Sequence, residues 1–415
     1  MKNISLMLSA LLMTFVIGCQ TKSNVMKKDE VVSNLQEKLI MAKDGDVIEL
    51  PEGTFQFAKP LSIDKLNNIT LKGQGKDKTI ISFKGQTEGA EGLKISACHH
   101  LTLEGFSMFD TKGDIIKAQE CKDLSISSVK VGWTNGADSS NGSYALYPVT
   151  CENVLIQDCE VFGASDAGIY VGQSKNIIVR NNYVHENVAG IEIENSMNAE
   201  VYKNKAENNT GGICIFDLPN IPIKYGMNIR VFDNEITNNN HVNFAPLGNT
   251  VAMVPAGTGS FILSSDKVEF FNNKISNHHT VGTAVVSYLL LGTPITDSLY
   301  DPFYNGISIH DNVYTNGAKK PDISKPMGGL MAQMFGVNIP EIIIDGIYNP
   351  ANVDMKTGQL AGDKAISIKN NGNAQVVNLD AGQQFKKLQI DAKQFESANI
   401  IVRTDPSWYK EKLNK

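Results

Sequence analysis

Eight short segments with one shared pattern follow each other through the middle of the chain, and this repeat constrains the fold more than any other feature. They begin at Leu101, Leu124, Val154, Ile177, Ala199, Ile229, Val268 and Ile307. An asparagine stands five positions after each of the last five starts, at Asn182, Asn204, Asn234, Asn273 and Asn312. Short β segments at a near-constant spacing predict a solenoid, because each repeat buries its apolar face only by stacking on its neighbours. Identical amides on successive rungs can then hydrogen-bond along the axis.

A second strand in each coil indicates which side chains point away from the interior. It is visible at 168–171, 190–193 and 212–215. Alternation places the Ile and Val side chains of these strands inside and Tyr170, Glu192 and Cys214 outside. The coil before contributes Tyr147 at the equivalent outward place, and a later coil contributes Phe261. We therefore expect Tyr147, Tyr170 and Glu192 to face solvent on consecutive rungs.

Four insertions interrupt the repeat, at 132–143, 217–225, 238–257 and 289–303. The first and third enter just before the second strand of the coil, whereas the second and fourth leave just after it. All four are therefore expected to rise beside the same outward face and to form walls around it. Long loops on one side of a repeat array usually mark its binding face.

The start of the repeat region carries a first resemblance. Residues 31–42 have helical spacing without Gly or Pro, and GDVIELPEGTF (45–55) and ITLKGQG (69–75) follow. This opening is similar to that of the pectin-lyase-like proteins. The resemblance implies an all-β fold, a single-stranded right-handed parallel β-helix, with an N-terminal helical cap that covers unpaired edges. The β-helix with its cap is expected over 31–350, and an irregular β continuation with a second cap over 351–415.

The N-terminus reads as a targeting segment. Lys2 precedes an apolar stretch over 4–17, which is short for a membrane span and ends in Gly18-Cys19. This resembles the lipobox of bacterial lipoproteins, with residues 1–19 as signal peptide and lipobox, Cys19 as the lipidated residue and 20–30 as a polar tether. An ordinary signal peptide is the alternative. The expected location is the bacterial cell envelope, at the outer membrane facing the periplasm, with membrane contact through the lipid anchor only.

Charge and cysteine content narrow the remaining possibilities. The formal net charge of −6 argues against a nucleic-acid partner. Cys98, Cys121 and Cys151 occupy one position on three successive coils, which predicts a stack of small side chains at a tight corner, with one disulfide between neighbouring rungs as the alternative. No CxxC pair occurs, and His99 and His100 lie beside a single rung, so no metal site is expected.

Three further motifs carry a closer resemblance: DAGIYVGQS (166–174), NVAGIEIENS (187–196) and GGICIFDLP (211–219). They look closest to an uncharacterised family of exported parallel β-helix repeat proteins. Members of that family tend to be paired with an exported protein that resembles a c-type cytochrome. The resemblance therefore implies such a protein as a partner.

The same region is more distantly similar to the mannuronan C5-epimerases. Those enzymes carry a Tyr-Gly-x-Asp-Pro-His-Asp signature, in which an acid–base pair handles the C5 proton of a uronate. Here the corresponding stretch, 144–150, reads Tyr-Ala-Leu-Tyr-Pro-Val-Thr. Tyr147, Val149 and Thr150 stand where the signature has Asp, His and Asp. The catalytic residues of that family cannot be carried over.

The outward residues are nevertheless the candidates for chemistry. Removal of a proton next to a uronate carboxylate needs a base, an acid and a group that holds the carboxylate. The catalytic candidates are Tyr147, Tyr170 and Glu192, and the binding candidates are Asp166, Tyr170, Glu192, Glu194 and Asp217. The alternative is that they are ordinary solvated residues of a β face. No cofactor is expected, with calcium on Asp138 and Asp217 as the alternative.

Three functions remain open from the sequence. The first is binding, with or without processing, of a polysaccharide or another envelope glycan in a loop-walled groove. The second is a polysaccharide lyase or epimerase with an unrecognised acid–base set. The third is a non-catalytic partner of the cytochrome-like protein. A buried cluster of charge with aromatic flanks would favour the enzyme, and a flat apolar face would favour the partner.

Overall fold

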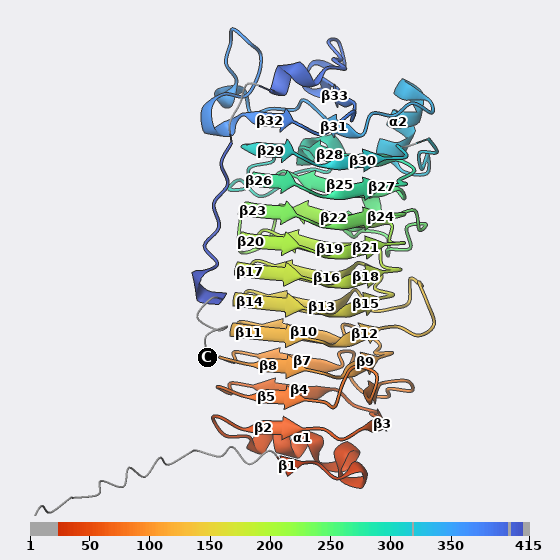
Figure 1. The fold of residues 1–415 in the computed structure, drawn as a ribbon, viewed down its shortest axis with the longest axis vertical. Helices are drawn as coiled ribbons and strands as arrows, with labels where there is room; N and C mark the ends of the chain where they lie inside the picture. The colour runs from red at the N-terminus through yellow and green to blue at the C-terminus, as the bar shows by residue number, and fades with distance from the viewer. Residues whose placement is uncertain (1–23, 318, 397–399, 410–415) are drawn as a thin grey trace, which may run out of the picture.

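The computed structural model describes residues 24–317, 319–396 and 400–409. Within them the chain winds through three parallel sheets, one strand of each sheet per coil, and the coils stack into a tall column (Figure 1). Successive segments at Ile177, Ala199 and Ile229 pair in parallel register. The predicted all-β parallel β-helix is confirmed.

Sheet A holds the strands that open each coil. They are β1 (Asn24–Val25), β2 (Val47–Glu49), β5 (Thr70–Lys72), β8 (Thr102–Glu104), β11 (Lys122–Ser127), β14 (Glu152–Gln157), β17 (Lys175–Arg180), β20 (Met197–Tyr202), β23 (Met227–Phe232), β26 (Asp266–Phe271), β29 (Ile307–His310) and β32 (Ile366–Lys369).

Sheet B follows sheet A in each coil and has shorter strands. They are β3 (Gly53–Gln56), β6 (Thr79–Ser82), β9 (Ser107–Phe109), β12 (Lys130–Gly132), β15 (Glu160–Phe162), β18 (Tyr183–His185), β21 (Lys205–Glu207), β24 (Glu235–Thr237), β27 (Lys274–Ser276) and β30 (Val313–Thr315).

Sheet C closes each coil and carries the candidate site. Its strands are β4 (Leu61–Asp64), β7 (Leu93–Ser96), β10 (Ile116–Gln119), β13 (Tyr144–Val149), β16 (Ala167–Gly172), β19 (Ala189–Glu194), β22 (Gly211–Phe216), β25 (Thr258–Leu263), β28 (Val281–Val286), β31 (Ile342–Ile344) and β33 (Val376–Asn378).

The interior is one continuous apolar core with polar ladders at its corners. Ile169, Ile191 and Ile213 are fully buried in it, as alternation predicts. The predicted asparagine ladder is present: each amide donates to the next at 2.9–3.0 Å, from Asn182 through Asn312. It extends one coil further, to Asn371. These bonds satisfy amides that would be costly to bury alone.

Helices cover the start of the column and part of its side. Helix α1 (Val31–Met41) lies where the sequence predicts it and buries Val31, Leu35 and Leu39 against the first coils. Helix α2 (Pro326–Phe335) was not predicted; its residues Met327, Leu330 and Met331 pack with the outward side chains of sheet C. None of the helices in the described part of the chain combines the length and hydropathy of a membrane-spanning segment.

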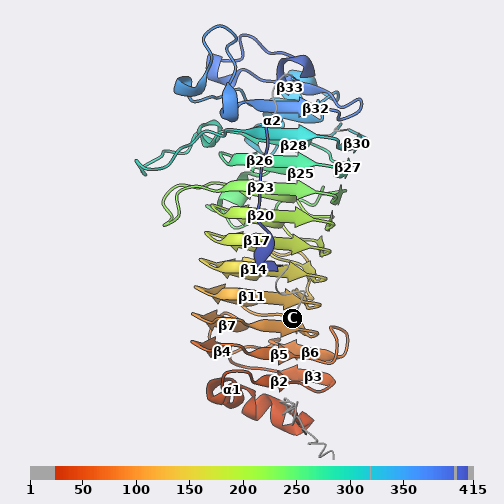
Figure 2. The same cartoon turned by 60° about the vertical axis from the view of Figure 1, so that its left-hand side comes forward.

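The last described residues, 400–409, turn back along sheet A, beside strands β17 and β14 (Figure 2). There Tyr409 packs with Leu155 and Ile178. The opposite end of the chain bears the predicted lipidation site, Cys19, which lies outside the described residues. Cys98, Cys121 and Cys151 are buried free thiols on successive rungs.

Candidate functional site

The outward side chains of sheet C form one column along the solenoid. Strand register aligns them in the order Lys94, Lys117, Tyr147, Tyr170, Glu192, Cys214 and Phe261. Tyr170, Cys214 and Phe261 belong to a second apolar cluster, separate from the interior core. Their predicted orientation, away from the interior, is therefore correct.

The predicted exposure of these side chains is wrong for two of the three. Tyr170 is 4% exposed and Glu192 is 3% exposed, whereas Tyr147 is half-buried. The physical reason is that the insertions fold over the face instead of standing beside it. Val251 and Val254 from 238–257, with neighbours from 217–225 and 289–303, pack with the outward side chains in one apolar cluster.

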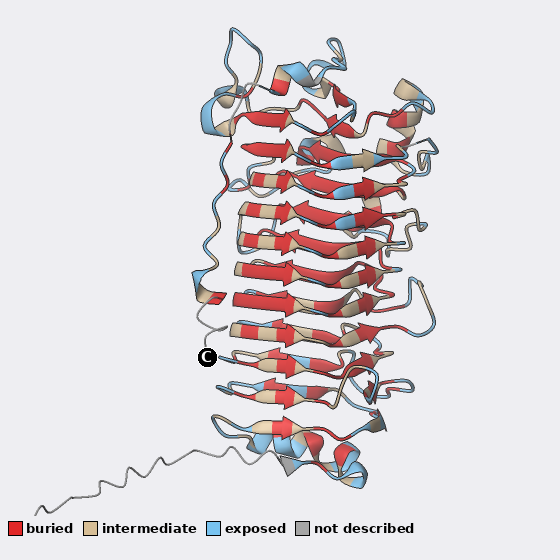
Figure 3. Cartoon of the chain, viewed as in Figure 1, coloured by how far each residue is buried: buried red, intermediate tan, exposed pale blue. Residues whose placement is uncertain are grey.

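Sheet C consequently has two halves on its outer face, and the division falls between β13 and β16 (Figure 3). In the open half, which spans β4 to β13, Ser62, Lys94 and Gln119 are exposed and Lys117 is half-buried. In the covered half, every described residue of β16, β19, β22, β25 and β28 is buried. The candidate residues lie at the boundary between the halves.

Three tyrosines mark this boundary. The ring centroids of Tyr144 and Tyr147 are 4.5 Å apart, and both rings contact Tyr170, at 4.5 and 5.0 Å. Tyr170 bends along its own strand over Gly172, where a Cβ atom would clash with the tyrosine hydroxyl. The Lys117 ammonium lies 4.8 Å from the centroid of the Tyr147 ring, on the side of the open half.

Three carboxyl groups lie behind the tyrosines. The Tyr170 hydroxyl donates to Glu194 at 2.6 Å, and the Tyr144 hydroxyl approaches Asp166 at 3.5 Å. The Asn249 amide, from insertion 238–257, donates to the same Asp166 carboxyl at 2.8 Å. We refer to Tyr144, Tyr147, Tyr170, Asp166, Glu192 and Glu194 as the tyrosine–carboxyl cluster.

Burial dominates the titration of these carboxyl groups. It raises the pKa of Asp166 to about 7, an effect strengthened by the Glu194 charge and opposed by hydrogen bonds from Asn249 and Tyr144. Burial also raises the pKa of Glu192 well above its ordinary value and, to a smaller degree, that of Glu194. In all three groups the shift favours the protonated form, which is the form in which a carboxyl group can act as a general acid.

Glu192 has an unused hydrogen-bonding position. Its carboxyl shares a hydrogen bond with that of Glu194. Its Oε2 atom, however, is buried and has no partner within the described residues. A buried polar atom without a partner costs on the order of 1–3 kcal/mol, and such costs concentrate at functional sites.

The remaining predicted ligands do not join the cluster. Asp217 accepts hydrogen bonds from the Gly226 amide and the Ser265 hydroxyl, so its buried carboxyl fixes insertion 217–225 to the solenoid. Asp138 lies in another insertion and accepts from its own neighbour Ser140. No group of three or more metal-ligating side chains occurs among the described residues.

Sequence reasoning missed several participants. Tyr144 is the first residue of β13, three positions before Tyr147, so strict alternation assigns it to the opposite face of the strand. Asn249 comes from a loop without any repeat signal. Lys94 and Lys117 could have been found, because Leu-Lys-Ile and Ile-Lys-Ala continue the alternation of sheet C into the two preceding coils. The stretch similar to the epimerase signature is β13, which carries Tyr147 at the boundary.

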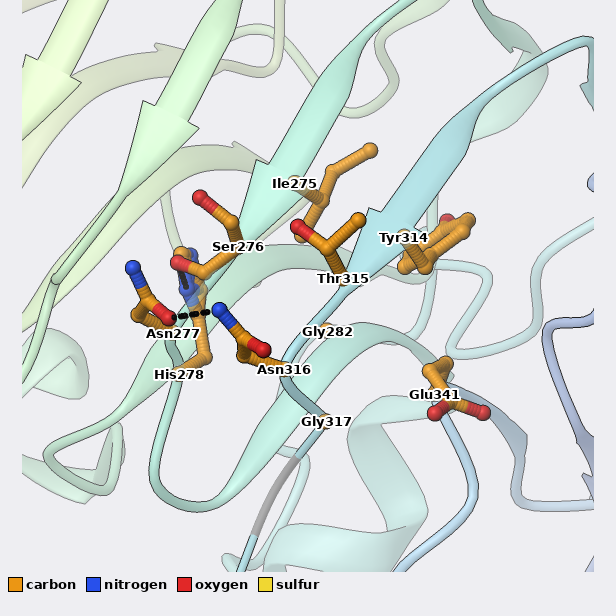
Figure 4. Close-up of a pocket in the computed structure, with 10 residues that line it drawn as sticks. All are labelled: Ile275, Ser276, Asn277, His278, Gly282, Tyr314, Thr315, Asn316, Gly317 and Glu341. Atoms are coloured by element: carbon orange, nitrogen blue, oxygen red, sulfur yellow. Dashed lines mark hydrogen bonds between the residues drawn. The ribbon is translucent and has the colours of Figure 1, made fainter.

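A separate small cavity lies between β27, β28 and β30, where His278, Tyr314 and Glu341 are among the lining residues (Figure 4). The Nε2 atom of His278 is buried and has no partner in the described part of the chain. Burial lowers the pKa of His278 to about 3, so the ring is neutral. The cavity, about 10 Å³, has room for about one water molecule and none for a sugar ring.

Comparison with known proteins agrees with this architecture. A family model described as "Right handed beta helix region" matches residues 138–289. The pre-neck appendage protein of Bacillus phage phi29 is 24% identical over 251 residues, which cover 51% of this chain. The match spans only 29% of the length of that relative.

Two solved structures share the fold at a TM-score of 0.50. One is the A-module of the mannuronan C-5 epimerase AlgE6 of Azotobacter vinelandii, 14% identical, with 72% of this chain and 71% of the other covered. The other is a polygalacturonase of Erwinia carotovora ssp. carotovora, 12% identical, with 77% and 90% covered. The chain therefore has a right-handed parallel β-helix fold, which it shares with the epimerase module and the polygalacturonase.

Proposed function

We propose that this protein is an exported, lipid-anchored β-helix that binds a polysaccharide of the cell envelope on the open half of sheet C. The observation that supports this best is the position of Tyr147. Its ring is half-buried, lies beside the Lys117 ammonium and stands where the open half meets the tyrosine–carboxyl cluster. Aromatic rings held rigidly at a polar surface suit the apolar face of a sugar ring.

The likeness to an epimerase module and a polygalacturonase supports a glycan as the ligand only through the fold. The chemistry of the boundary supports it independently. Hydroxyl groups of Tyr144 and Tyr147, the Lys117 ammonium and the Asp114 carboxyl offer donors and acceptors within one small region. Such a mixture of rings and polar groups is typical of carbohydrate recognition.

A second candidate function is acid–base catalysis on the bound polysaccharide, as in a lyase or epimerase. The observation in its favour is Glu192, a buried carboxyl with one unpartnered oxygen next to Glu194. In this role Glu192 and Glu194 would hold the transferable proton, and Tyr170, whose hydroxyl donates to Glu194 at 2.6 Å, would connect this pair to the boundary where the polysaccharide lies. The charge cluster with aromatic flanks favours this function over a cytochrome partnership.

One experiment separates binding from catalysis. The purified full-length protein in detergent is incubated with alginate, polygalacturonate, hyaluronate and neutral dextran. Binding is followed by calorimetry, and products by absorbance of unsaturated sugars and by NMR of the uronate configuration. Binding without product supports the first function, and product that Glu192→Gln abolishes supports the second. No binding to any of the four polymers would contradict both.

The partnership with a cytochrome-like protein stays a prediction of the family resemblance. In the covered half of sheet C, the apolar outward side chains pack against the chain's own loops and α2 rather than against solvent. Co-purification of an exported c-type cytochrome with the wild-type protein, retained in Tyr147→Ala, would support the partnership over glycan binding.

The lipid anchor is tested through Cys19. Cys19→Ala removes the acceptor for the acyl chains, so we expect the variant to leave the membrane fraction or to be retained unprocessed. Labelled fatty acid should enter the wild-type protein and not the variant. Wild-type protein found entirely in the soluble periplasmic fraction would contradict an anchor.

A further inference from the structure

We infer that the open half of sheet C receives the end of an acidic polysaccharide chain, with the terminal sugar against Tyr147, and that it does not hold an internal segment. This inference rests on the proposed glycan-binding function and specifies which part of the polymer is recognised. It depends on where the open half stops and on the charges along it.

The exposed surface of sheet C ends abruptly after Tyr147. Tyr147 and Tyr170 occupy adjacent rungs, about 4.8 Å apart. The Tyr147 side chain is half-buried, whereas Tyr170 is buried under residues of insertion 238–257. A polymer lying along the outward column would therefore meet a wall after Tyr147, within the length of a single rung.

Insertions 238–257 and 217–225 form the wall beyond Tyr147. Asn249 donates to Asp166, and Val251 and Val254 pack in the apolar cluster of the covered half. From the other side, the amide of Asn195 binds the carbonyls of Leu218 and Ile223 and holds insertion 217–225 in place. Loops attached by polar bonds and by apolar packing on both sides make a fixed stop for a chain.

The rungs of sheet C that lead to Tyr147 carry positive charge. Lys94 and Lys117 stand on consecutive rungs of the column that leads to Tyr147. In the described part of the chain neither ammonium group forms an ion pair within 4.0 Å, although Asp114 lies near enough for its pKa to be affected by Lys117. Two cations in line beside an aromatic ring suit a chain whose successive sugars carry carboxylates.

Polar groups lie beside Tyr147, where the open half of sheet C ends. A terminal sugar over Tyr147 would lie beside the hydroxyl of Tyr144 and face the boundary behind which Asp166 and Glu194 are held. The hydroxyl group of Tyr144 can bind a chain-end hydroxyl, which an internal sugar lacks. The position that recognises the end is thus the same position that approaches the buried carboxyl groups.

The test varies the number of chain ends at constant mass. Alginate, polygalacturonate and hyaluronate are each partly depolymerised, and binding to the full-length protein is measured before and after. Because binding follows the concentration of ends, a tenfold reduction in mean chain length should raise the affinity per gram by about tenfold. An unchanged affinity per gram, with binding retained, would overturn the chain-end inference and leave glycan binding intact.

Two variants locate the effect. Lys94→Gln with Lys117→Gln should weaken binding at least about tenfold at low salt, and the loss should shrink as salt rises. Lys122→Gln is the matched control, because Lys122 begins the sheet A strand of the same region and pairs with Glu152 on another face. Equal losses in both variants would overturn the inference. If none of the three polymers binds, the proposed function itself fails.

Discussion

The two halves of the outer face of sheet C share one backbone geometry and differ in what lies on it. In the open half the outward column carries Lys94, Lys117 and Tyr147. In the covered half it carries Cys214 and Phe261, on which the insertions and α2 pack. The comparison teaches that the coil provides a uniform ladder and that the insertions decide which rungs meet solvent. The tyrosine–carboxyl cluster lies at the boundary between the rungs that meet solvent and the rungs that the insertions cover.

The largest expected effect is a difference in the free energy of unfolding between substitutions in the covered half and in the open half. Phe261→Ala removes a ring that is buried in the covered half and packed edge-on against Phe216 at 5.8 Å. We expect a loss of about 3–5 kcal/mol in the free energy of unfolding, measured by denaturant titration. Lys94→Ala in the open half should change it by about 0.5 kcal/mol or less. Similar losses for the two variants would remove the distinction between the halves.

The next effect is the pH dependence of stability that Asp166 causes at the boundary between the two halves. The folded-state pKa of Asp166 is raised to about 7 from an ordinary value of 3.8, so the folded protein binds a proton that the unfolded chain releases. This group therefore stabilises the fold fully below about pH 4, and that contribution is lost as pH rises to about 7. Asp166→Asn should lack this loss, which we expect to be about 2–4 kcal/mol between pH 4 and 8. Parallel pH profiles for variant and wild type would contradict the assignment.

A smaller effect tests whether the solenoid beneath the halves is uniform. Asn204→Leu breaks the ladder at the Asn182 and Asn234 contacts, each 3.0 Å long. Unsatisfied buried amides on both neighbours should lower the free energy of unfolding by about 1–3 kcal/mol. Glu235→Leu, an exposed change in β24, serves as control. A variant that melts like the wild type would show that the ladder contributes little.

The adjacent tyrosines provide the finest comparison. Tyr147→Ala should weaken glycan binding by about 1–3 kcal/mol through lost ring stacking, with a modest change in stability. Tyr170→Ala should chiefly lower stability, since this ring is buried and bonded to Glu194. Calorimetry for binding and denaturant titration for stability separate the two outcomes. An equal loss of affinity without a loss of stability in Tyr170→Ala would place the boundary one rung further on.

The sequence predicted the solenoid well because its signals are periodic. Asn204, Ile191 and Ile213 stand at positions dictated by a repeat, and helix α1 has its own 3.6-residue spacing. It also predicted the correct side of the strand for Tyr170 and Glu192. Their burial could not be predicted, because it depends on insertions such as 238–257, whose path follows no period.

The same limit applies to individual roles. Asp217 was expected as a binding residue on the walls of the outward face, yet its hydrogen bonds with Gly226 and Ser265 attach insertion 217–225 to the solenoid. Tyr144 escaped prediction because alternation from Tyr147, three positions away in β13, assigns it to the opposite face of the strand. Spacing identifies the rung and face of a residue, whereas contacts between distant loops determine its environment.

The most direct test of the central claim is a crystal structure of the protein with an acidic oligosaccharide of four to six sugars bound. Our account predicts sugar density along β7 and β10, with carboxylates at Lys94 and Lys117 and the last ring over Tyr147. It predicts no sugar density beyond the boundary at β16. An oligosaccharide that crosses this boundary, or one bound on sheet A or sheet B instead, would contradict it.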